Sequence, residues 1–361
     1  MKFIHALPTN SWLRRLFVSF LIGILSIAMA ACGNQTESIS INGPIMGTQY
    51  QVTMVCNSDN SEEQWQALLL AEMDAVNQSM STWISDSEIS MFNQNNSTEF
   101  ESASEALMDV LSISMDVSTQ TDGAFDVTVM PLVNLWGFGP RSKKSDQLKH
   151  PEPPSDEELA LVKETVGYTK LQISADASQW KKTHPNVNVD FSAVAKGYAV
   201  DKVSERLTDS GCEHHMVDIG GEVRVTGKNA EGNDWRIAIE KPDTINQFQA
   251  VIDVSDISIA SSGDYRNFYM IDGKRYSHTI DPRTYKPIEH NLASVTVLDQ
   301  EAAKADAFAT AFMVMGNDAI DFAQENNIPA YFILRSVDQQ NQSSGEFVVE
   351  YTDTFEKYIV R

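Results

Sequence analysis

The sequence predicts an α+β protein in which mixed, mainly antiparallel sheets pack against helices. Two observations lead to this fold class. Apolar residues recur at helical spacing in several separate segments, and short alternating segments with turn signals follow one another along the second half of the chain. Helices and strands therefore do not alternate regularly, as they would in a parallel α/β sheet.

The chain is expected to begin with a signal peptide, residues 1–32, that ends in a lipobox. A basic start leads into an apolar run over residues 16–31, which is too short to span a membrane comfortably. Cys32 follows two alanines, so we expect it to be lipidated and to become the new N-terminus. An ordinary signal peptide cut near Ala31 and an uncleaved anchor are the alternatives. Residues 33–42 are polar and are predicted to be a tether.

Helices are the first elements expected in the domain that follows, residues 43–361. Their apolar spacing places them over residues 61–80, 102–117, 193–208 and 302–315, with a short helix after Pro154. Two of them open with a capping box, Ser102 with Glu105 and Ser155 with Glu158.

Strands and one loop complete the expected elements. Alternation and turn residues predict strands over residues 50–55, 187–189, 216–219, 235–240, 248–254, 258–261, 268–271, 276–280 and 293–298. The charged, proline-rich residues 143–154 are predicted to be a surface loop and mark a possible internal boundary of the domain.

The composition is strongly acidic, with 50 Asp and Glu against 27 Lys and Arg and a formal net charge of −23. Such a surface argues against nucleic acid or an anionic membrane face as a partner. A ligand that carries phosphate must therefore be held by a local cation, either a metal ion or a lysine.

Three cysteines are present, and with Cys32 assigned to a lipid, Cys56 and Cys212 remain. In an oxidising periplasm they could pair, but the sequence does not place them within bonding distance, so both states stay open. Their spacing does not indicate zinc or haem.

A metal site is predicted at Asp306 and Thr310. On a helix these residues lie one turn apart on the same face, and a carboxylate with a hydroxyl suits Mg²⁺, which takes few protein ligands. The alternative is a helix with one polar stripe. No glycine-rich dinucleotide motif or Walker loop occurs in the sequence.

Two further segments have the residue types of a phosphate site. After Asp190 a turn of small residues leads into a helix, and Lys196 in its first turn is placed to meet a phosphate. His278 lies at the end of a strand and is a candidate acid, base or phosphate donor. The alternatives are an exposed lysine, a strand-terminal aspartate and a structural histidine.

A turn at residues 121–128 is a candidate wall for a flat ring. Asp122-Gly123 is a turn signal, and Phe125 beside it suits stacking on a ring. The alternative is a loop that enters the core.

The order of these motifs resembles that of the ApbE family of FAD:protein FMN transferases over essentially all of residues 43–361. The matching segments are residues 46–48, 80–83, 86–90, 121–126, 195–198, 220–221, 278–284 and 305–310. The resemblance implies the ApbE-like fold and a flavin pocket whose FAD contacts are Met46, Trp83, Ala124, Phe125, Asp126, Asp190, Lys196 and Ile280.

The resemblance also implies a Mg²⁺ site formed by the Ala193 carbonyl, the Asp306 carboxylate and the Thr310 hydroxyl. His278 and Asp306 are the implied catalytic residues. Two positions depart from the family pattern, because Trp83 stands where Tyr is common and Tyr285 stands where Gly is usual.

The activity that the resemblance implies is Mg²⁺-dependent transfer of FMN from FAD to a Thr or Ser of an acceptor protein, with release of AMP. The implied acceptors are subunits of ion-pumping NADH:quinone oxidoreductases or related electron-transport complexes. This function favours a lipid-anchored protein on the periplasmic side of the bacterial inner membrane. A FAD pyrophosphatase and a non-catalytic FAD-binding lipoprotein are the alternatives, and the sequence does not separate transfer from hydrolysis.

Overall fold

The computed structural model describes residues 38–57, 59–139, 152–242, 244, 247–337 and 343–360. The expected signal peptide with Cys32 and residues 33–37 of the expected tether lie outside these ranges, as do residues 143–151 of the expected loop. Residues 38–361 form one compact unit. Within the described ranges, no helix is long and apolar enough to cross a membrane.

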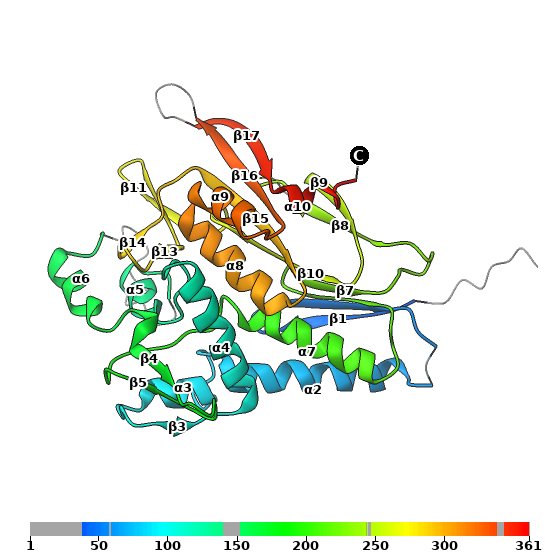
Figure 1. Ribbon diagram of the computed structural model, residues 1–361, viewed down its shortest axis with the longest axis horizontal. Coiled ribbons are helices and arrows are strands. Elements are labelled where there is room, and N and C mark those ends of the chain that lie inside the picture. The colour runs from blue at the N-terminus through cyan, green and yellow to red at the C-terminus, as the bar shows by residue number, and fades with distance from the viewer. Residues whose placement is uncertain are drawn as a thin grey trace, which may run out of the picture. The chain divides into compact units, whose positions relative to one another are not determined.

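An eight-stranded sheet is the centre of this unit (Figure 1), in the order β1–β2–β6–β7–β10–β15–β16–β17. Its strands are β1 (Ile39–Ile45), β2 (Thr48–Met54), β6 (His215–Ile219), β7 (Glu222–Thr226), β10 (Ile257–Gly263), β15 (Leu292–Asp299), β16 (Ala330–Val337) and β17 (Ser343–Tyr351). Each neighbouring pair is antiparallel, which confirms the predicted fold class.

Shorter strands form smaller sheets beside it. They are β3 (Glu101–Ser102), β4 (Leu171–Ile173), β5 (Gln179–Lys182), β8 (Trp235–Glu240), β9 (Phe248–Val254), β11 (Phe268–Ile271), β12 (Lys274–Ser277), β13 (Ile280–Asp281) and β14 (Lys286–Pro287). They pair as β3–β5–β4, β8–β9, β11–β12 and β13–β14.

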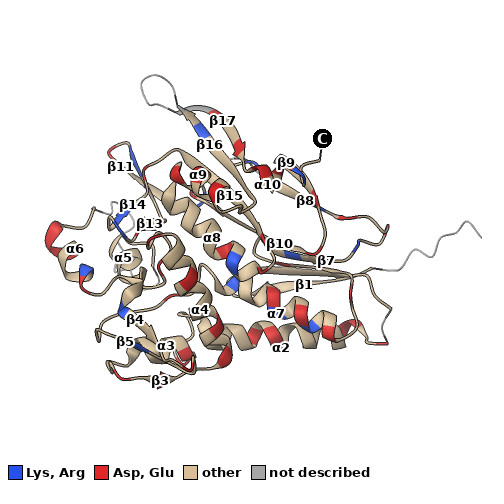
Figure 2. Ribbon diagram, in the orientation of Figure 1, with Lys and Arg blue, Asp and Glu red and all other residues tan. Residues whose placement is uncertain are grey.

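The described helices are α2 (Glu62–Met80), α3 (Glu88–Gln94), α4 (Glu105–Gln120), α5 (Met130–Leu135), α6 (Asp156–Lys163), α7 (Ala195–Asp209), α8 (Ala302–Met315), α9 (Asp318–Glu325) and α10 (Asp353–Glu356), with a 3₁₀ turn η1 (Tyr168–Lys170). Helices α7 and α8 pack directly on the central sheet, and α2 and α4 pack against these two helices (Figure 1). Figure 2 shows acidic residues distributed over several helices, α2, α6 and α9 among them, as expected from the net charge.

Most of the central sheet is buried on both faces, because its side chains alternate between two apolar clusters, whereas one face of β1 and β2 is exposed. On β10, Ile257 and Ile259 belong to the cluster under the β8–β9 hairpin, whereas Ala260 belongs to the larger cluster under the helices. The burial of alternate side chains on opposite faces follows from the two-residue period of a strand. Strand β15 lies in the middle of the sheet and is buried on both sides.

Several expected boundaries need correction. β1 begins at Ile39, inside the segment expected to be a tether. The capping box predicted at Ser102 was wrong, because Ser102 is in β3 and α4 starts three residues later. Ser104 caps this helix instead, since its side chain accepts a hydrogen bond from the backbone N–H of Leu107. The capping box of Ser155 with Glu158 is confirmed.

Two expected strands also differ. Residues 187–189 form no strand, because the amide side chain of Asn93 bonds both backbone groups of Val189 and thereby replaces a neighbouring strand. The strand expected over residues 276–280 breaks at His278, with β12 ending at Ser277 and β13 starting at Ile280. The backbone N–H of His278 still donates a hydrogen bond to the Asn267 carbonyl, next to the β11–β12 pair.

Two local features settle points that the sequence left open. Cys56 and Cys212 form a disulfide, with Cα atoms 5.1 Å apart. Tyr285 adopts φ +64°, a left-handed conformation that favours glycine, which explains why glycine is usual there in the family that the sequence resembles. The carbonyl of Tyr285 accepts a hydrogen bond from the indole of Trp136, which holds the turn in place.

Candidate functional site

A cavity of about 470 Å³ gathers most of the predicted site residues. Its wall includes Ala124, Phe125, Asp126, Asp190, Ala193, Lys196, His278, Ile280, Asp306 and Thr310. These residues come from segments that are far apart in the sequence: the loop after α4, the start of α7, the segment around β13, and α8. Their roles toward FAD and Mg²⁺ were implied by the family resemblance, and these roles stay predictions.

Two predicted FAD contacts, Met46 and Trp83, do not line this cavity. Trp83 is 77% exposed between α2 and α3, so it is not part of the core. Met46 occupies the two-residue turn between β1 and β2 with φ +48°, a strained conformation for a side chain of this size. Their contact with FAD stays a prediction.

The loop after α4 provides one wall. Phe125 is almost fully buried and contacts both the cavity and the main core. It therefore belongs to the cavity wall and to the core at the same time. The Asp126 carboxylate accepts hydrogen bonds from the backbone N–H and the hydroxyl of Thr128 and from the N–H of Tyr168. Burial nevertheless raises the pKa of Asp126, and these bonds oppose that effect. The hydrogen bonds of this carboxylate hold the loop in its conformation.

The start of α7 provides a second wall. Asp190 Oδ1 accepts hydrogen bonds from the N–H of Ser192 at 2.9 Å and from its hydroxyl at 2.5 Å, which fixes the turn that presents Ala193. The helix begins at Ala195, and the side chain of its own N-cap residue does not cap it. The N–H groups of Ala195 and Gly197 are already bonded, to the Phe191 carbonyl and to Asp306, so Lys196 is the group of this turn that is suited to an anionic ligand.

Lys196 lies between two buried carboxylates. Its Nζ is 2.9 Å from Glu222 Oε1 and 3.6 Å from Asp306 Oδ2, and both carboxylates are about 95% buried. Burial alone would lower the pKa of Lys196, but Asp306 and Glu222 outweigh it and raise this pKa. Lys196 is therefore always charged at physiological pH.

When both carboxylates are ionised, Lys196 balances only one of their two negative charges. Burial, and then the charge of Asp306, raises the pKa of Glu222 to about 8, although Lys196 opposes this shift. Burial likewise raises the pKa of Asp306 against the effects of Lys196 and of the Gly197 N–H. A cation in the cavity would favour the ionised form of both groups.

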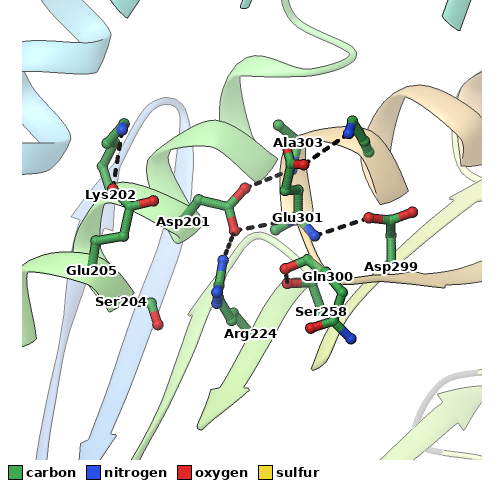
Figure 3. A network of polar contacts seen from close by, with 12 residues as sticks. Asp201, Lys202, Ser204, Glu205, Arg224, Ser258, Asp299, Gln300, Glu301 and Ala303 are labelled. Atoms are coloured by element: carbon green, nitrogen blue, oxygen red, sulfur yellow. Dashed lines mark hydrogen bonds and ion pairs between the residues drawn. The ribbon is translucent and has the colours of Figure 1, made fainter. Parts of the chain in front are cut away.

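Helix α8, which carries Asp306 and Thr310, is fixed against α7 by a side chain of α7. Asp201 Oδ1 accepts a hydrogen bond from the N–H of Ala302 at 2.9 Å, and Oδ2 accepts one from the N–H of Ala303 at 3.0 Å (Figure 3). No side chain of its own N-cap residue performs this capping. Arg224 of β7 binds Asp201 Oδ1 at 2.5 Å and balances its charge.

A close approach of the two helices completes this arrangement. An added Cβ on Gly197 would lie 2.3 Å from the carbonyl oxygen of Ala302, so only glycine permits this separation. One turn further along α8, Asp306 Oδ2 accepts a hydrogen bond from the Gly197 N–H at 3.2 Å. Residues 197 and 201 of α7 therefore position the start of α8 and the carboxylate that it carries.

The oxygen atoms beside Lys196 fit a hard divalent cation. Thr310 and Asp306 line the same cavity as Ala193, and the Thr310 hydroxyl is 3.5 Å from that of Ser262. Glu222 Oε2 is buried without a hydrogen-bond partner. No group of three or more His, Cys, Asp or Glu side chains placed to hold a metal occurs among the described residues. A carboxylate, a hydroxyl and a carbonyl are a set that suits Mg²⁺, which keeps several waters.

His278 is held in one tautomer. Its Nδ1 lies 3.0 Å from the carbonyl oxygen of Asn267, and because a carbonyl only accepts, Nδ1 carries the proton. The neutral ring therefore has its lone pair on Nε2. Burial lowers the pKa of His278, partly offset by the bond to Asn267, so this lone pair is available at neutral pH.

Sequence reasoning missed Glu222 as a residue of the cavity. A signal was present, because Glu222 directly follows the Gly220-Gly221 turn at the start of a strand whose next alternate residues are Val223 and Val225. An acidic residue on the face opposite two buried valines of the same strand faces a different environment from theirs.

The comparisons with known proteins decide the family. The ApbE family model matches residues 46–332. The chain belongs to the ApbE family. A curated FAD:protein FMN transferase of Haemophilus influenzae is 40% identical over 353 residues, covering 93% of this chain and 96% of the relative. That of Vibrio cholerae is 40% identical over 324 residues, covering 89% and 95%.

Solved structures of ApbE proteins share the fold. The flavin transferase ApbE from Vibrio cholerae has a TM-score of 0.79 at 38% identity, covering 89% of this chain and 99% of that one. The flavinyl transferase ApbE from Pseudomonas stutzeri, in its apo form, has a TM-score of 0.79 at 33% identity, covering 89% and 96%. The predicted ApbE-like fold is confirmed.

Proposed function

We propose that the chain is a Mg²⁺-dependent enzyme that transfers FMN from FAD to a threonine of an acceptor protein and releases AMP. The transfer of FMN from FAD to an acceptor protein is the activity by which the chain's curated relatives are named, and the chain is a transferase of that kind. The observation that supports the finer mechanism is the convergence of Lys196, His278, Asp306 and Thr310 on one cavity.

The residues of the cavity have separate roles in this proposal. Asp306, Thr310 and the carbonyl of Ala193 would hold Mg²⁺, which neutralises the pyrophosphate and makes AMP a better leaving group. Lys196, in the first turn of α7, binds the phosphate oxygens. Phe125 and Ile280 provide apolar surface for the flavin, since both are buried in the cavity wall.

His278 acts as the general base. The threonine oxygen of the acceptor attacks the phosphorus of the FMN half, and the bond from this phosphorus to the bridging oxygen breaks. AMP leaves with the bridging oxygen, and the threonine proton passes to Nε2 of His278. The Asn267 carbonyl holds the ring in the required tautomer throughout. No nucleophilic side chain of this chain takes part, because the acceptor provides the nucleophile.

The cellular setting is part of the same proposal. The disulfide of Cys56 with Cys212 supports an oxidising compartment, in agreement with a periplasmic protein anchored through a lipid on Cys32. The acceptors would then be periplasmic flavin-carrying subunits of ion-pumping NADH:quinone oxidoreductases or related complexes. Hydrolysis of FAD to FMN and AMP uses the same groups with water as the nucleophile, and it is the second candidate function.

The test follows AMP release and flavin fluorescence on a denaturing gel. Purified protein is incubated with FAD, with and without Mg²⁺, and with and without a candidate acceptor. We expect acceptor-bound fluorescence only with Mg²⁺, and its loss in Asp306→Ala. Release of AMP that is equal with and without acceptor, with no fluorescent acceptor band, would refute transfer and establish hydrolysis. Full activity of Asp306→Ala would refute the metal site.

A further inference from the structure

Glu222 is a carboxylate of the cavity that the mechanism above does not use. It is the first residue of β7 and is 4% exposed. One oxygen, Oε1, pairs with Lys196 at 2.9 Å. The other, Oε2, is buried and has no hydrogen-bond partner, although the residue lines the cavity.

An unpartnered, buried carboxylate oxygen is costly, because it loses its water without a replacement donor. The fold does not require this cost. The neighbouring residues of β7 explain its place in the sheet, since Val223 and Val225 pack into the cluster under β8–β9 and Arg224 binds Asp201. The free oxygen therefore indicates a ligand that donates hydrogen bonds or carries positive charge.

The charges of the cavity distinguish between possible ligands. When both carboxylates are ionised, Asp306 and Glu222 carry two negative charges, and Lys196 lies against both and supplies one positive charge. The remaining negative charge favours a cation as the ligand beside Glu222. Mg²⁺ keeps several of its waters when it binds proteins, and these waters donate hydrogen bonds to nearby acceptors.

We propose that Glu222 is a further residue of the divalent-cation site, whose free oxygen accepts hydrogen bonds from the water shell of the ion. This inference rests on the proposed Mg²⁺ dependence and adds a second carboxylate to the site. Glu222 also has an indirect effect through Lys196. It holds Nζ at 2.9 Å while Asp306 lies at 3.6 Å, so the ammonium competes less for the carboxylate that binds the ion.

The test measures cation binding directly, with Mn²⁺ as the probe. The signal of free Mn²⁺ in electron paramagnetic resonance is titrated with the full domain in the absence of FAD, for wild type and Glu222→Gln. The substitution keeps the shape but removes the charge and turns an acceptor into a donor. We expect the Kd for Mn²⁺ to rise by about 10- to 100-fold. FAD affinity, measured with EDTA present, should be unchanged.

Asp218→Asn is the matched control. Asp218 lies on the same β-hairpin and accepts a hydrogen bond from the Gly221 N–H, but it does not line the cavity. This variant removes the same charge nearby and should leave the Kd for Mn²⁺ unchanged. Glu222→Asp keeps the charge but cannot reach as far, so we expect an intermediate Kd. It also provides the comparison if Glu222→Gln fails to fold, as judged by circular dichroism.

The outcomes separate this inference from the proposed function. If wild type transfers FMN and binds Mn²⁺, but Glu222→Gln binds it equally well, the inference alone is refuted. The same holds if Glu222→Gln loses FAD affinity in EDTA while its Kd for Mn²⁺ is unchanged, since the free oxygen would then bind FAD. If wild type binds no Mn²⁺ with or without FAD, the proposed metal dependence and the inference both fail.

Discussion

Gly197→Ala tests whether the spacing of α7 and α8 determines activity. An added Cβ would lie 2.3 Å from the oxygen and 2.6 Å from the carbon of the Ala302 carbonyl. Carbon atoms pack about 3.5–4.0 Å apart. The two helices must therefore separate by about 1 Å, because these atoms belong to the backbone and cannot rotate away.

Two effects on stability oppose each other in this variant. Alanine in place of glycine favours a helix by roughly 0.5–1 kcal/mol, whereas the forced shift costs about 1–3 kcal/mol. We expect a net loss of roughly 0–2 kcal/mol, so the protein should still fold. The activity should fall much further. Asp306 accepts the Gly197 N–H and faces Lys196, and a displacement of about 1 Å in an active site can lower the rate about 100-fold.

The assay is AMP release in a single turnover at saturating FAD and acceptor, together with the melting temperature. Leu207→Val is the control, since Leu207 is fully buried and lies ten residues further along α7, about 15 Å away. It should lose about 0.8 kcal/mol of stability for one methylene and keep its rate. A folded Gly197→Ala protein with the wild-type rate would refute the reasoning.

Three further predictions concern single residues. His278→Ala should slow FMN transfer by about 10²–10⁴-fold with little change in FAD affinity; lost affinity with normal turnover per bound FAD would make His278 a ligand-positioning residue. Trp83→Ala should weaken FAD binding roughly tenfold if the exposed ring stacks on the ligand, whereas Trp83→Tyr should be nearly neutral. Isothermal titration calorimetry measures the Kd for FAD, and equal values for wild type and both variants would contradict the contact. Burial, opposed by a bond to the Cys212 carbonyl, lowers the pKa of His215 to about 4, so the unfolded chain binds a proton that the folded one does not between pH 6.5 and 4. This stability is present above pH 6.5 and is lost as the pH falls, by about 3 kcal/mol in all. The free energy of unfolding, measured by chemical denaturation, should therefore decrease less steeply below pH 6.5 in His215→Gln than in wild type. An equal decrease in both proteins would show that other groups dominate.

Local patterns in the sequence predicted many elements correctly. The helix over residues 302–315 and the strands over 235–240 and 248–254 were predicted with the observed bounds, because apolar periodicity and turn residues act within a few positions. The capping box at Ser155 was likewise visible, since both partners lie three residues apart. The grouping of Asp306 with Thr310 also needed only the helical repeat.

The sequence by itself determined the fold class, the long helices, about half of the strands and the residue types of the site, since each depends on neighbours along the chain or on an ordered set of motifs. Only the tertiary structure decided contacts between distant segments. Asp201 caps a helix that begins 101 positions later, and Cys56 bonds Cys212 across 156 positions. Glu222 became a cavity residue for the same reason: its neighbours Lys196 and Asp306 come from two helices that meet only because Gly197 lets them approach. A pattern along the chain records which face a side chain occupies, but the group that it meets there depends on how helices and sheet pack.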